Sequence, residues 1–215
     1  MAEQLREVLN KTVSGDPNDQ TQALQYLEHA QETSFPDFLK ALAEVLVSEA
    51  SGPVARQAAG LQIKNALSSK DETLLAQLQQ RWIRLPEDVK VQVKTQVVQT
   101  LGTESTRPSV AAQCISAITV AELTQTPSNS DIITVLMQNV TNAQSTEMLK
   151  EASLEAIGYI CADIESDVLG PRANEILTAI VHGMRKQEQS DHVRLAATTA
   201  LYNSLEFTRA NFEEE

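Results

Sequence analysis

The stretch RQAAGLQI, at residues 56–63, recurs as KEASLEAI at residues 150–157 and as RLAATTAL at residues 194–201. Each copy begins with a basic residue, continues with small residues and ends with isoleucine or leucine. This spacing is typical of a helix whose packing face is lined by small side chains. The first two copies start 94 residues apart, which is twice 47, and the third starts 44 residues later. The chain is therefore predicted to repeat one unit about every 45 residues, the period of stacked helix pairs.

The prolines mark where helices begin, since proline is well tolerated in the first turn of a helix. They are Pro17, Pro36, Pro53, Pro86, Pro108, Pro127 and Pro171. Helices are thus predicted to begin about every 20 residues, with Ser145 capping the one missing from the last interval. Alternate prolines, from Pro36 onward, lie 50, 41 and 44 residues apart. This larger period resembles that of HEAT-repeat arrays.

The pattern predicts five helix pairs and one extra helix at 71–83. The pairs are 3–13 with 17–31, 35–48 with 54–68, 86–102 with 108–123, 129–142 with 145–162, and 171–187 with 191–206. We therefore expect an all-α fold, a right-handed α-α superhelix (HEAT-repeat solenoid), as a single array over residues 1–215. The repeats are expected at about 1–31, 32–69, 84–124, 127–163 and 165–207. The tail EFTRANFEEE is expected to begin a sixth, truncated repeat.

The composition of the chain limits its partners. The formal net charge is −12, so no nucleic-acid binding is expected, because phosphate contacts need clustered lysine and arginine. A basic protein partner and simple solubility both fit this charge. No apolar run reaches the roughly 18 residues that a membrane-spanning helix needs, so no membrane association is expected. Cys114 and Cys161 lie in apolar helical runs and are predicted to be buried free thiols in a reducing, intracellular compartment.

The chain carries no motif that predicts catalysis. It contains no HExxH, GxSxG, P-loop or GxGxxG motif, and His29, His182 and His192 are scattered. Cys161 with a distant histidine is the alternative nucleophile pair, but its setting, GYICADI, is a core pattern. Neither cysteine has a CxxC partner for a zinc site. We therefore expect no enzyme, no metal and no cofactor, and a function based on surface recognition.

Polar residues on the predicted helix 54–68 form a candidate binding surface. Arg56, Gly60 and Lys64 are spaced four residues apart and so share one stripe, and Lys70 follows the helix. The packing face is expected to contain Ala58, Ala59, Ile63, Ala66 and Leu67. The stripe is either a docking patch on the inner face of a solenoid or a solvated face with cations near a helix C-terminus. The residues alone leave both readings open.

Five longer stretches resemble the amino-terminal repeats of the importin-beta family of karyopherins. They read VARQAAGLQIKNALSSKDETLLAQLQQRWI, LGTESTRPSVAAQC, STEMLKEASLEAIGYICADI, NEILTAIVHGMRK and AATTALYNSLEFTRANF. The resemblance implies a receptor that binds the GTPase Ran in its GTP form (Ran-GTP) on its inner face and then releases cargo in the nucleus. It implies that Lys64, Asn65 and Lys70 face Ran. Arg107 and Asp163 are expected at further Ran contacts.

The resemblance also implies docking of Phe-Gly (FG) repeats of nucleoporins on the outer face. In the family, that groove lies between the first helices of the fifth and sixth repeats. Leu177, Thr178 and Val181 would form its fifth-repeat wall, and ordinary packing between helices is the alternative for these residues. The sixth repeat would be missing after Glu215, leaving half a site.

Further partners and locations follow from the same resemblance. Importin alpha is an expected partner through its importin-beta-binding segment, mainly through later repeats, and the cargo carries a nuclear localisation signal (NLS). The expected locations are the cytoplasm, the nucleus and the nuclear pore in the nuclear envelope. A generic HEAT-repeat scaffold, a different karyopherin and an enzyme with a helical fold are the alternatives. Binding of Ran-GTP distinguishes a transport receptor from a generic scaffold.

Overall fold

A computed structural model of the chain describes residues 2–124 and 131–213. All regular structure in these residues is helical, which confirms the predicted all-α fold. Contacts divide the chain into two compact units, Met1–Thr100 and Leu101–Glu215. The division runs through the expected repeat 84–124, whose two helices belong to different units.

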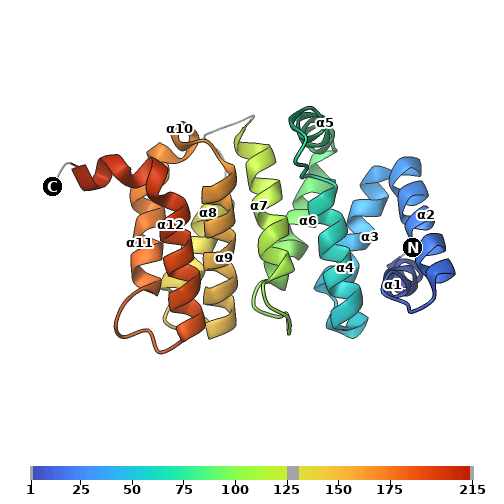
Figure 1. Ribbon diagram of the computed structural model, residues 1–215, viewed down its shortest axis with the longest axis horizontal. Helices are drawn as coiled ribbons and strands as arrows, with labels where there is room; N and C mark the ends of the chain where they lie inside the picture. Colours follow the sequence, from blue (N-terminus) through green and yellow to red (C-terminus); the bar gives the residue numbers. More distant parts are fainter. Residues whose placement is uncertain (1, 125–130, 214–215) are drawn as a thin grey trace. The chain divides into compact units, whose positions relative to one another are not determined.

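The first unit is built around one central helix, α3. Its helices are α1 (Ala2–Lys11), α2 (Pro17–Thr33), α3 (Phe35–Val47), α4 (Gly52–Asn65), α5 (Glu72–Ile83) and α6 (Glu87–Thr100), with a 3-10 turn at Glu49–Ser51 (Figure 1). Helix α3 contacts α1, α2, α4 and α6. Eight of its thirteen residues are buried, including Phe38, Leu42 and Leu46. The apolar run that begins at Phe35 therefore forms the core of this unit.

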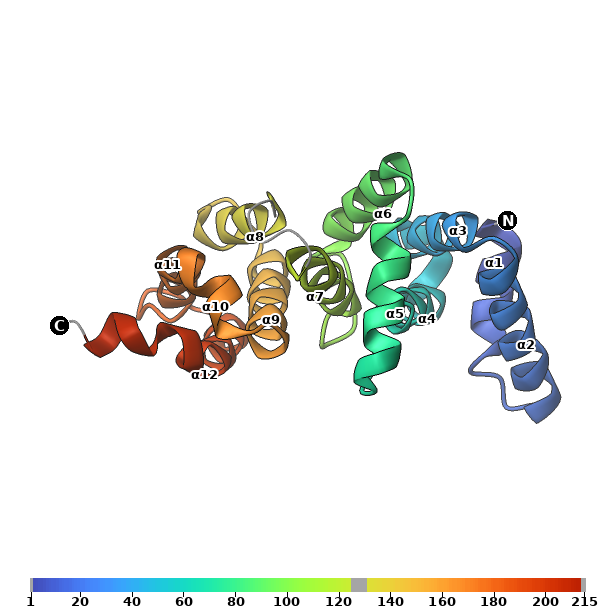
Figure 2. The ribbon, with the colours of Figure 1, turned by 90° about the horizontal axis from the view of Figure 1, so that it is seen from above.

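The second unit arranges its helix pairs in two layers. Its helices are α7 (Val110–Leu123), α8 (Asp131–Thr141), α9 (Glu147–Asp163), α10 (Ser166–Leu169), α11 (Ala173–Gly183) and α12 (Asp191–Glu213), with a 3-10 turn at Gly170–Arg172. Figure 2 shows α8 and α11 on one side of this unit and α9 and α12 on the other. Helix α9 contacts both α7 and α12. The second helices of neighbouring pairs thus form one continuous layer.

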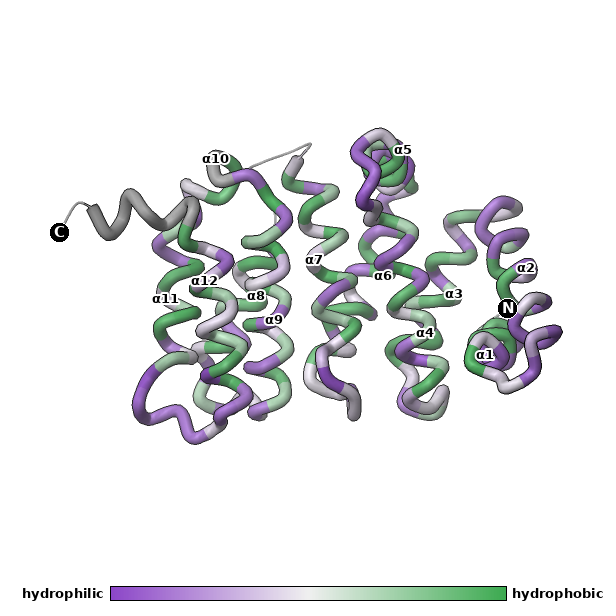
Figure 3. Tube along the Cα trace, in the orientation of Figure 1, coloured by the Kyte–Doolittle hydropathy of each residue, from purple (hydrophilic) through white to green (hydrophobic). Residues whose placement is uncertain are grey.

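Small residues allow α9, α11 and α12 to approach closely. A Cβ atom on Gly158 of α9 would lie 3.3 Å from the Cα of Ala200 on α12. A Cβ atom on Gly183 of α11 would lie 2.9 Å from the Cβ of Ala197 and 2.8 Å from a methyl carbon of Leu154. The small residues of the recurring stretches are therefore needed where helices touch. Figure 3 shows the hydrophilic loop 184–190, which joins α11 to α12 outside this contact.

Side-chain caps set several helix starts. Asp16, Asp71, Ser109 and Thr146 each accept a hydrogen bond from a backbone N–H in the first turn of the helix that follows. Such bonds satisfy donors that the first turn leaves unpaired. Thr146 Oγ1 accepts from Leu149 N–H at 3.2 Å, so the predicted cap at Ser145 is wrong by one residue.

The chain departs from the predicted spans mainly near its carboxyl end. Helix α11 ends at Gly183 rather than near 187, and α10 with its 3-10 turn occupies the segment before it. The tail that was expected to begin a sixth repeat instead continues α12 to Glu213. Pro127 and the predicted helix start at 129 lie outside the described residues. Among the helices that are described, none is both long and apolar enough to cross a membrane.

Candidate functional site

Helix α4 buries the side that carries Arg56 and Gly60. The predicted packing face is confirmed for Ala59, Ile63, Ala66 and Leu67, which are almost inaccessible. Arg56 is also buried, and its Nε donates a 2.7 Å hydrogen bond to the carbonyl of Leu46 in the last turn of α3. Because the last carbonyls of a helix lack intrahelical partners, Arg56 caps α3. Arg56 and Gly60 therefore belong neither to a docking patch nor to a solvated face, the two readings left open for this stripe, and only its Lys64 end reaches the surface.

The carboxyl end of α4 presents the three residues predicted there, Lys64, Asn65 and Lys70, which we call the α4 surface. Lys64 is half-buried in the last turn, whereas Asn65 and Lys70 are exposed. Within the described residues, neither lysine forms an ion pair. Asp71, next to Lys70, is used as the cap of α5, where its Oδ1 accepts from Leu74 N–H at 2.8 Å. In a chain of net charge −12, these lysines are suited to the acidic or carbonyl groups of a partner.

The loop before α7 is fixed by a buried carboxylate, Glu104. It accepts hydrogen bonds from the backbone N–H groups of Val110 at 3.0 Å and Ala111 at 3.3 Å, and from the Ser109 hydroxyl. Ser109 Oγ in turn accepts from Ala112 N–H at 3.0 Å. An anion is favoured here because the first N–H groups of a helix are unpaired and carry a partial positive charge. Glu104 thereby holds the loop 101–109 against the start of α7.

Arg107, in the same loop, pairs with Glu151 of α9. Its Nε lies 2.8 Å and 3.0 Å from the two carboxylate oxygens. Glu151 is buried, whereas the arginine side chain is 46% exposed. The hydrogen bond to Glu151, and then its charge, raise the pKa of Arg107. This guanidinium therefore positions Glu151 within the second unit, and its contact with Ran stays a prediction.

Glu155 lies one turn after Glu151 and is also partly buried. One of its oxygens accepts from Ser109 N–H at 2.8 Å, and the other accepts no hydrogen bond from the described residues. Burial, and the negative charges of Glu151 and Glu104, raise the pKa of Glu155 despite the Ser109 bond. We call Glu104, Glu151 and Glu155 the carboxylate cluster. Arg107 pairs with this cluster through Glu151, and His192 Nδ1 lies 3.8 Å from Oε1 of the same residue.

Replacing Glu155 by glutamine is expected to stabilise the protein modestly near neutral pH. A carboxyl whose pKa is higher in the folded state favours folding at low pH, and this contribution is lost as the pH rises through the folded pKa. Glutamine stays neutral and retains an oxygen for Ser109 N–H. The urea midpoint of Glu155→Gln should therefore exceed that of the wild type at pH 7.5, and the two should converge toward pH 4. A variant that is less stable at both pH values would contradict this assignment.

Helices α9 and α12 enclose a groove of about 170 Å³, the α9–α12 groove. The helices lie side by side in both views (Figures 1 and 2). Glu151 and Glu155 line one end of the groove, Leu195 its middle, and Tyr159 and Asn203 the other end. The 3.8 Å approach of His192 Nδ1 to Glu151 Oε1 and the 3.0 Å bond from Asn203 Nδ2 to the carbonyl of Gly158 show that α9 and α12 run in the same direction.

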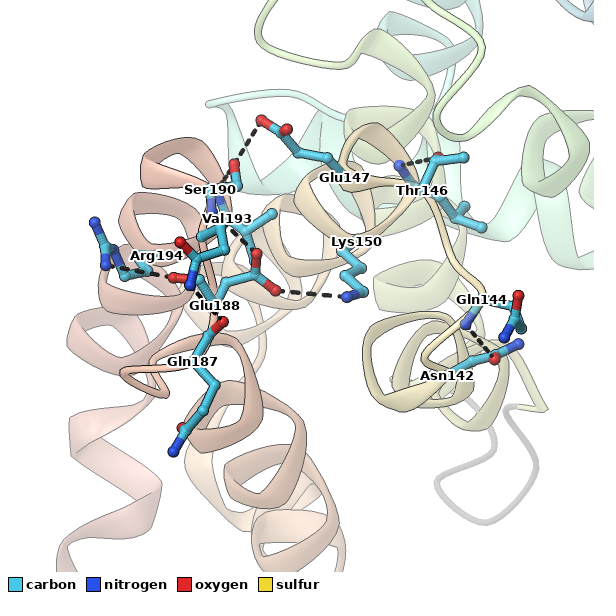
Figure 4. A network of polar contacts seen from close by, with 12 residues as sticks. Asn142, Gln144, Thr146, Glu147, Lys150, Gln187, Glu188, Ser190, Val193 and Arg194 are labelled. Carbon is cyan, nitrogen blue, oxygen red and sulfur yellow. Dashed lines mark hydrogen bonds and ion pairs between the residues drawn. The ribbon is translucent and has the colours of Figure 1, made fainter.

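A polar network holds the start of α9 against the loop before α12 (Figure 4). Ser190 donates to Glu147 Oε1 at 2.5 Å, and Lys150 Nζ lies 3.5 Å from Glu188 Oε2. Ser190 Oγ also accepts from Val193 N–H at 3.3 Å and so caps α12. These contacts fix the register of the two helices and therefore the shape of the α9–α12 groove.

Asp163 lies far from Arg107 although both were predicted to contact one partner. It is the exposed last residue of α9, whereas Arg107 binds Glu151 near the start of that helix. Twelve residues separate Glu151 from Asp163, which is about 18 Å along the helix axis at 1.5 Å per residue. The structure therefore places these two predicted residues at opposite ends of α9.

The predicted nucleoporin residues share the outward side of α11. Leu177 is half-buried, and Thr178 and Val181 are exposed, Val181 to 55%. The Thr178 hydroxyl donates its proton to the carbonyl of Asn174 at 2.7 Å, within the same helix. Because both side chains are exposed, ordinary packing between helices within the described residues does not account for Thr178 and Val181. We call these three residues the α11 face.

The two cysteines are buried free thiols, as predicted. Burial raises the pKa of Cys161 to about 12, which keeps the thiol protonated, and the thiolate is the reactive form. Among the described residues, no cluster of three or more His, Cys, Asp or Glu side chains is placed to hold a metal ion. The histidine pairing considered for Cys161 therefore gains no support from its environment.

The sequence interpretation missed the carboxylate cluster and the α9–α12 groove. Glu151 and Glu155 were visible within KEASLEAI only as spaced acidic residues of a helix. Arg107, the partner of Glu151, lies 44 residues before it, and Ser109, the partner of Glu155, lies 46 residues before it. That separation equals one repeat, so the repeat period was the signal that could have paired them.

Known proteins resemble this chain in sequence and in fold. The family profile described as the importin-beta N-terminal domain matches residues 23–103. Importin subunit beta-1 of Schizosaccharomyces pombe is 43% identical over 210 residues, which cover 97% of this chain and 24% of that protein. The chain therefore spans about a quarter of the length of this relative.

Solved structures give the same likeness. A complex of Kap95, which is yeast importin beta, with Nup1 is 33% identical, with a TM-score of 0.87 over 99% of this chain and 25% of that chain. A structure in which Kap95p binding induces the switch loops of RanGDP to adopt the GTP-bound conformation is 32% identical. Its TM-score is 0.85 over 99% of this chain and 24% of that chain. The predicted helical-repeat fold is thus confirmed by structures of this kind.

Proposed function

Because this chain belongs to the importin-beta family, we propose that it is part of a nuclear transport receptor and binds Ran-GTP through its α4 surface. The observation that carries the proposal is the likeness, over nearly the whole chain, to Kap95 structures that include complexes with RanGDP and with Nup1. Such a receptor works by differential affinity and performs no chemistry. Ran-GTP binding in the nucleus releases the cargo that was bound in the cytoplasm.

The α4 surface has the properties that such a contact requires. Lys64 and Lys70 have no acidic partner within the described residues, and Asn65 offers both a donor and an acceptor beside them. Switch segments of a GTPase are ordered by the γ-phosphate. Kap95p drives the switch loops of RanGDP into the GTP-bound conformation. For this chain we expect RanGDP to bind more weakly, because the energy of rearranging those loops is subtracted from the binding energy.

Reversing both lysine charges is expected to weaken Ran-GTP binding at least tenfold, about 1.4 kcal/mol. The measurement is calorimetric titration of Lys64→Glu/Lys70→Glu and of the wild type with Ran carrying a non-hydrolysable GTP analogue, and with RanGDP. Arg185→Glu/Lys186→Glu is the matched control, since both residues are exposed in the loop after α11. It carries the same change in net charge and should bind within twofold of the wild type.

Several outcomes would contradict the Ran proposal. Equal wild-type affinity for both nucleotide states would remove the basis for directional transport. An equal loss in the control variant would mean that net charge, and not the α4 surface, determines the affinity. A generic HEAT-repeat scaffold, the competing function, should bind Ran in neither state.

The α11 face supports a second proposed role, docking of nucleoporin FG repeats. Leu177, Thr178 and Val181 would form one wall of that groove, and the exposure of Thr178 and Val181 supports this role. In the family arrangement the opposite wall comes from the first helix of a sixth repeat. We also propose importin alpha as a partner through later repeats, and the cytoplasm, the nucleus and the nuclear pore as the places where the receptor acts.

A further inference from the structure

We propose that the exposed side of α5 binds an extended acidic segment of a protein partner, in which two glutamate or aspartate residues are separated by one residue. The inference rests on a hollow that contains two arginines, on the charge around it and on the spacing of its donors. It goes beyond the proposed function, because it uses neither the α4 surface nor the α11 face.

Helix α5 is the extra helix of the first unit and lies outside its helix pairs. Figure 1 shows α5 end-on, so it runs across the direction of α4. One side of α5 is anchored by the buried residues Gln79 and Trp82. The other side forms a hollow of about 460 Å³, the α5 hollow, which is lined by Ala76, Gln77, Gln80, Arg81 and Arg84.

Arg81 is held in the α5 hollow by the end of α2 and the start of α3. Its Cζ lies 3.7 Å from the centroid of the Phe35 ring, and its Nη2 donates a 2.8 Å hydrogen bond to the carbonyl of Gln31. Its remaining N–H groups donate to no other described residue. Because this guanidinium is already fixed, a ligand that accepts from those N–H groups costs little side-chain entropy.

The charge of the α5 hollow calls for an anion. Residues 73–86 contain two arginines and no aspartate or glutamate, and neither arginine forms an ion pair with the described residues. Burial lowers the pKa of Arg81, and the charge of Glu32 on α2 offsets this only in part. The two guanidiniums outweigh the partial charge of about −0.5 at the carboxyl end of a helix. A carboxylate is the matching ligand, because it can accept two parallel hydrogen bonds from one arginine.

The spacing of the donors sets the spacing of the acidic residues. Arg81 and Arg84 are three residues apart on one helix, so their Cβ atoms are about 5–6 Å apart. In an extended chain, side chains two residues apart point to the same side and are about 6.6 Å apart. Such a segment can place one carboxylate on each arginine. The side-chain amides of Gln77 and Gln80 form no hydrogen bond with the described residues and can bind the peptide groups of the segment.

A nucleic acid is a poorer occupant of the α5 hollow than a short acidic segment. The chain has a net charge of −12, and a phosphate backbone that extends beyond the hollow would be repelled by it. A segment with two acidic residues is repelled less, because both carboxylates lie against the arginines.

The test is an NMR titration of the isotope-labelled chain with the peptide Gly-Ser-Glu-Gly-Glu-Gly-Ser. Signals of residues 76–84 should shift more than those of the rest of the chain. Arg84→Gln should bind at least fivefold more weakly. Arg81→Lys keeps the charge but loses the paired donors, and should bind at least threefold more weakly. Arg185→Gln is the matched control, because Arg185 is exposed in the loop after α11 and the charge change is identical. It should bind within twofold of the wild type.

Two further peptides separate charge from spacing. Gly-Ser-Gln-Gly-Gln-Gly-Ser should bind the wild type at least fivefold more weakly than the glutamate peptide, yet bind Arg84→Gln with little further loss. Gly-Ser-Glu-Glu-Gly-Gly-Ser places its carboxylates on opposite sides of an extended chain, and should bind the wild type at least threefold more weakly.

Four results would overturn the proposal. They are no binding of the first peptide by the wild type, shifts that fall outside α5 and its contacts, an equal loss of affinity in Arg185→Gln, and tighter binding of a single-stranded oligonucleotide to the same residues. None of these results depends on Ran, so a failure here leaves the Ran proposal to its own titration.

Discussion

Replacing Gly102 by alanine should lower the free energy of unfolding by about 3 kcal/mol. Gly102 has a φ of +74°, a left-handed conformation that costs other residues roughly 1–2 kcal/mol. A Cβ atom would also lie 2.7 Å from both the Cα and the N of Leu149. These are backbone atoms in the first turn of α9, so they cannot rotate away as a flexible side chain would, and overpacking of this kind costs about 1–3 kcal/mol.

Urea unfolding followed by far-UV circular dichroism measures this loss. Gly170→Ala is the matched control, because a Cβ atom there would meet nothing within 4 Å, and its midpoint should stay near that of the wild type. Trp82 lies in the first unit and is fully buried, so its fluorescence reports that unit separately. A wild-type midpoint for Gly102→Ala would show that the loop 101–109 can move off α9 without cost.

Replacing Glu104 by alanine should cost about 2–3 kcal/mol of stability. Its carboxylate accepts from Val110 N–H, Ala111 N–H and the Ser109 hydroxyl, all at the start of α7. Hydrogen bonds to a charged group contribute roughly 1.5–3 kcal/mol, and buried donors left unpaired add a desolvation penalty. Relief of the repulsion between Glu104 and Glu155 offsets part of this loss.

The same variant has a local signature in amide hydrogen exchange. Exchange at Val110 and Ala111 should accelerate in Glu104→Ala more than exchange in α3, because the lost bonds are confined to the start of α7. Glu104→Gln keeps one acceptor oxygen and should fall between the alanine variant and the wild type. Glu28→Ala, on the exposed side of α2, controls for the change in net charge. Unchanged exchange at α7 would mean that water replaces the carboxylate without loss.

The helical pattern of this chain was readable because its causes are local. Pro17 falls at the start of α2, and the spans predicted at 71–83 and 108–123 match α5 and α7 to within two residues. Prolines and small residues act within one or two turns of a helix. The period of about 45 residues repeats along the chain and can therefore be recognised without the structure. Of the two largest departures, α11 ends at Gly183, a glycine that the prediction did not use as a boundary, whereas the extension of α12 lies in a stretch, 191–213, that contains no proline or glycine.

The candidate site was only partly readable from the sequence. The positions of Lys64, Asn65 and Lys70 at a helix end, and of Thr178 and Val181 on an exposed side, follow from helical spacing together with a family resemblance. Arg56 shows the limit of that reasoning. It shares a stripe with Lys64 by spacing, yet it is buried, because the carbonyl of Leu46 on α3 lies within reach of its Nε. Spacing on one helix cannot say which neighbour that stripe meets.

The sequence by itself determined a chain of helix pairs with small residues on the second helices. Only the tertiary structure decided which charges those helices bring together. Arg107 with Glu151, Ser109 with Glu155 and Ser190 with Glu147 are each separated by more than forty residues. Such pairs depend on the register between neighbouring repeats, and a shift of one helical turn is 5.4 Å, longer than any hydrogen bond. Local periodicity therefore determined the helices, and the register of packing determined the carboxylate cluster and the groove beside it.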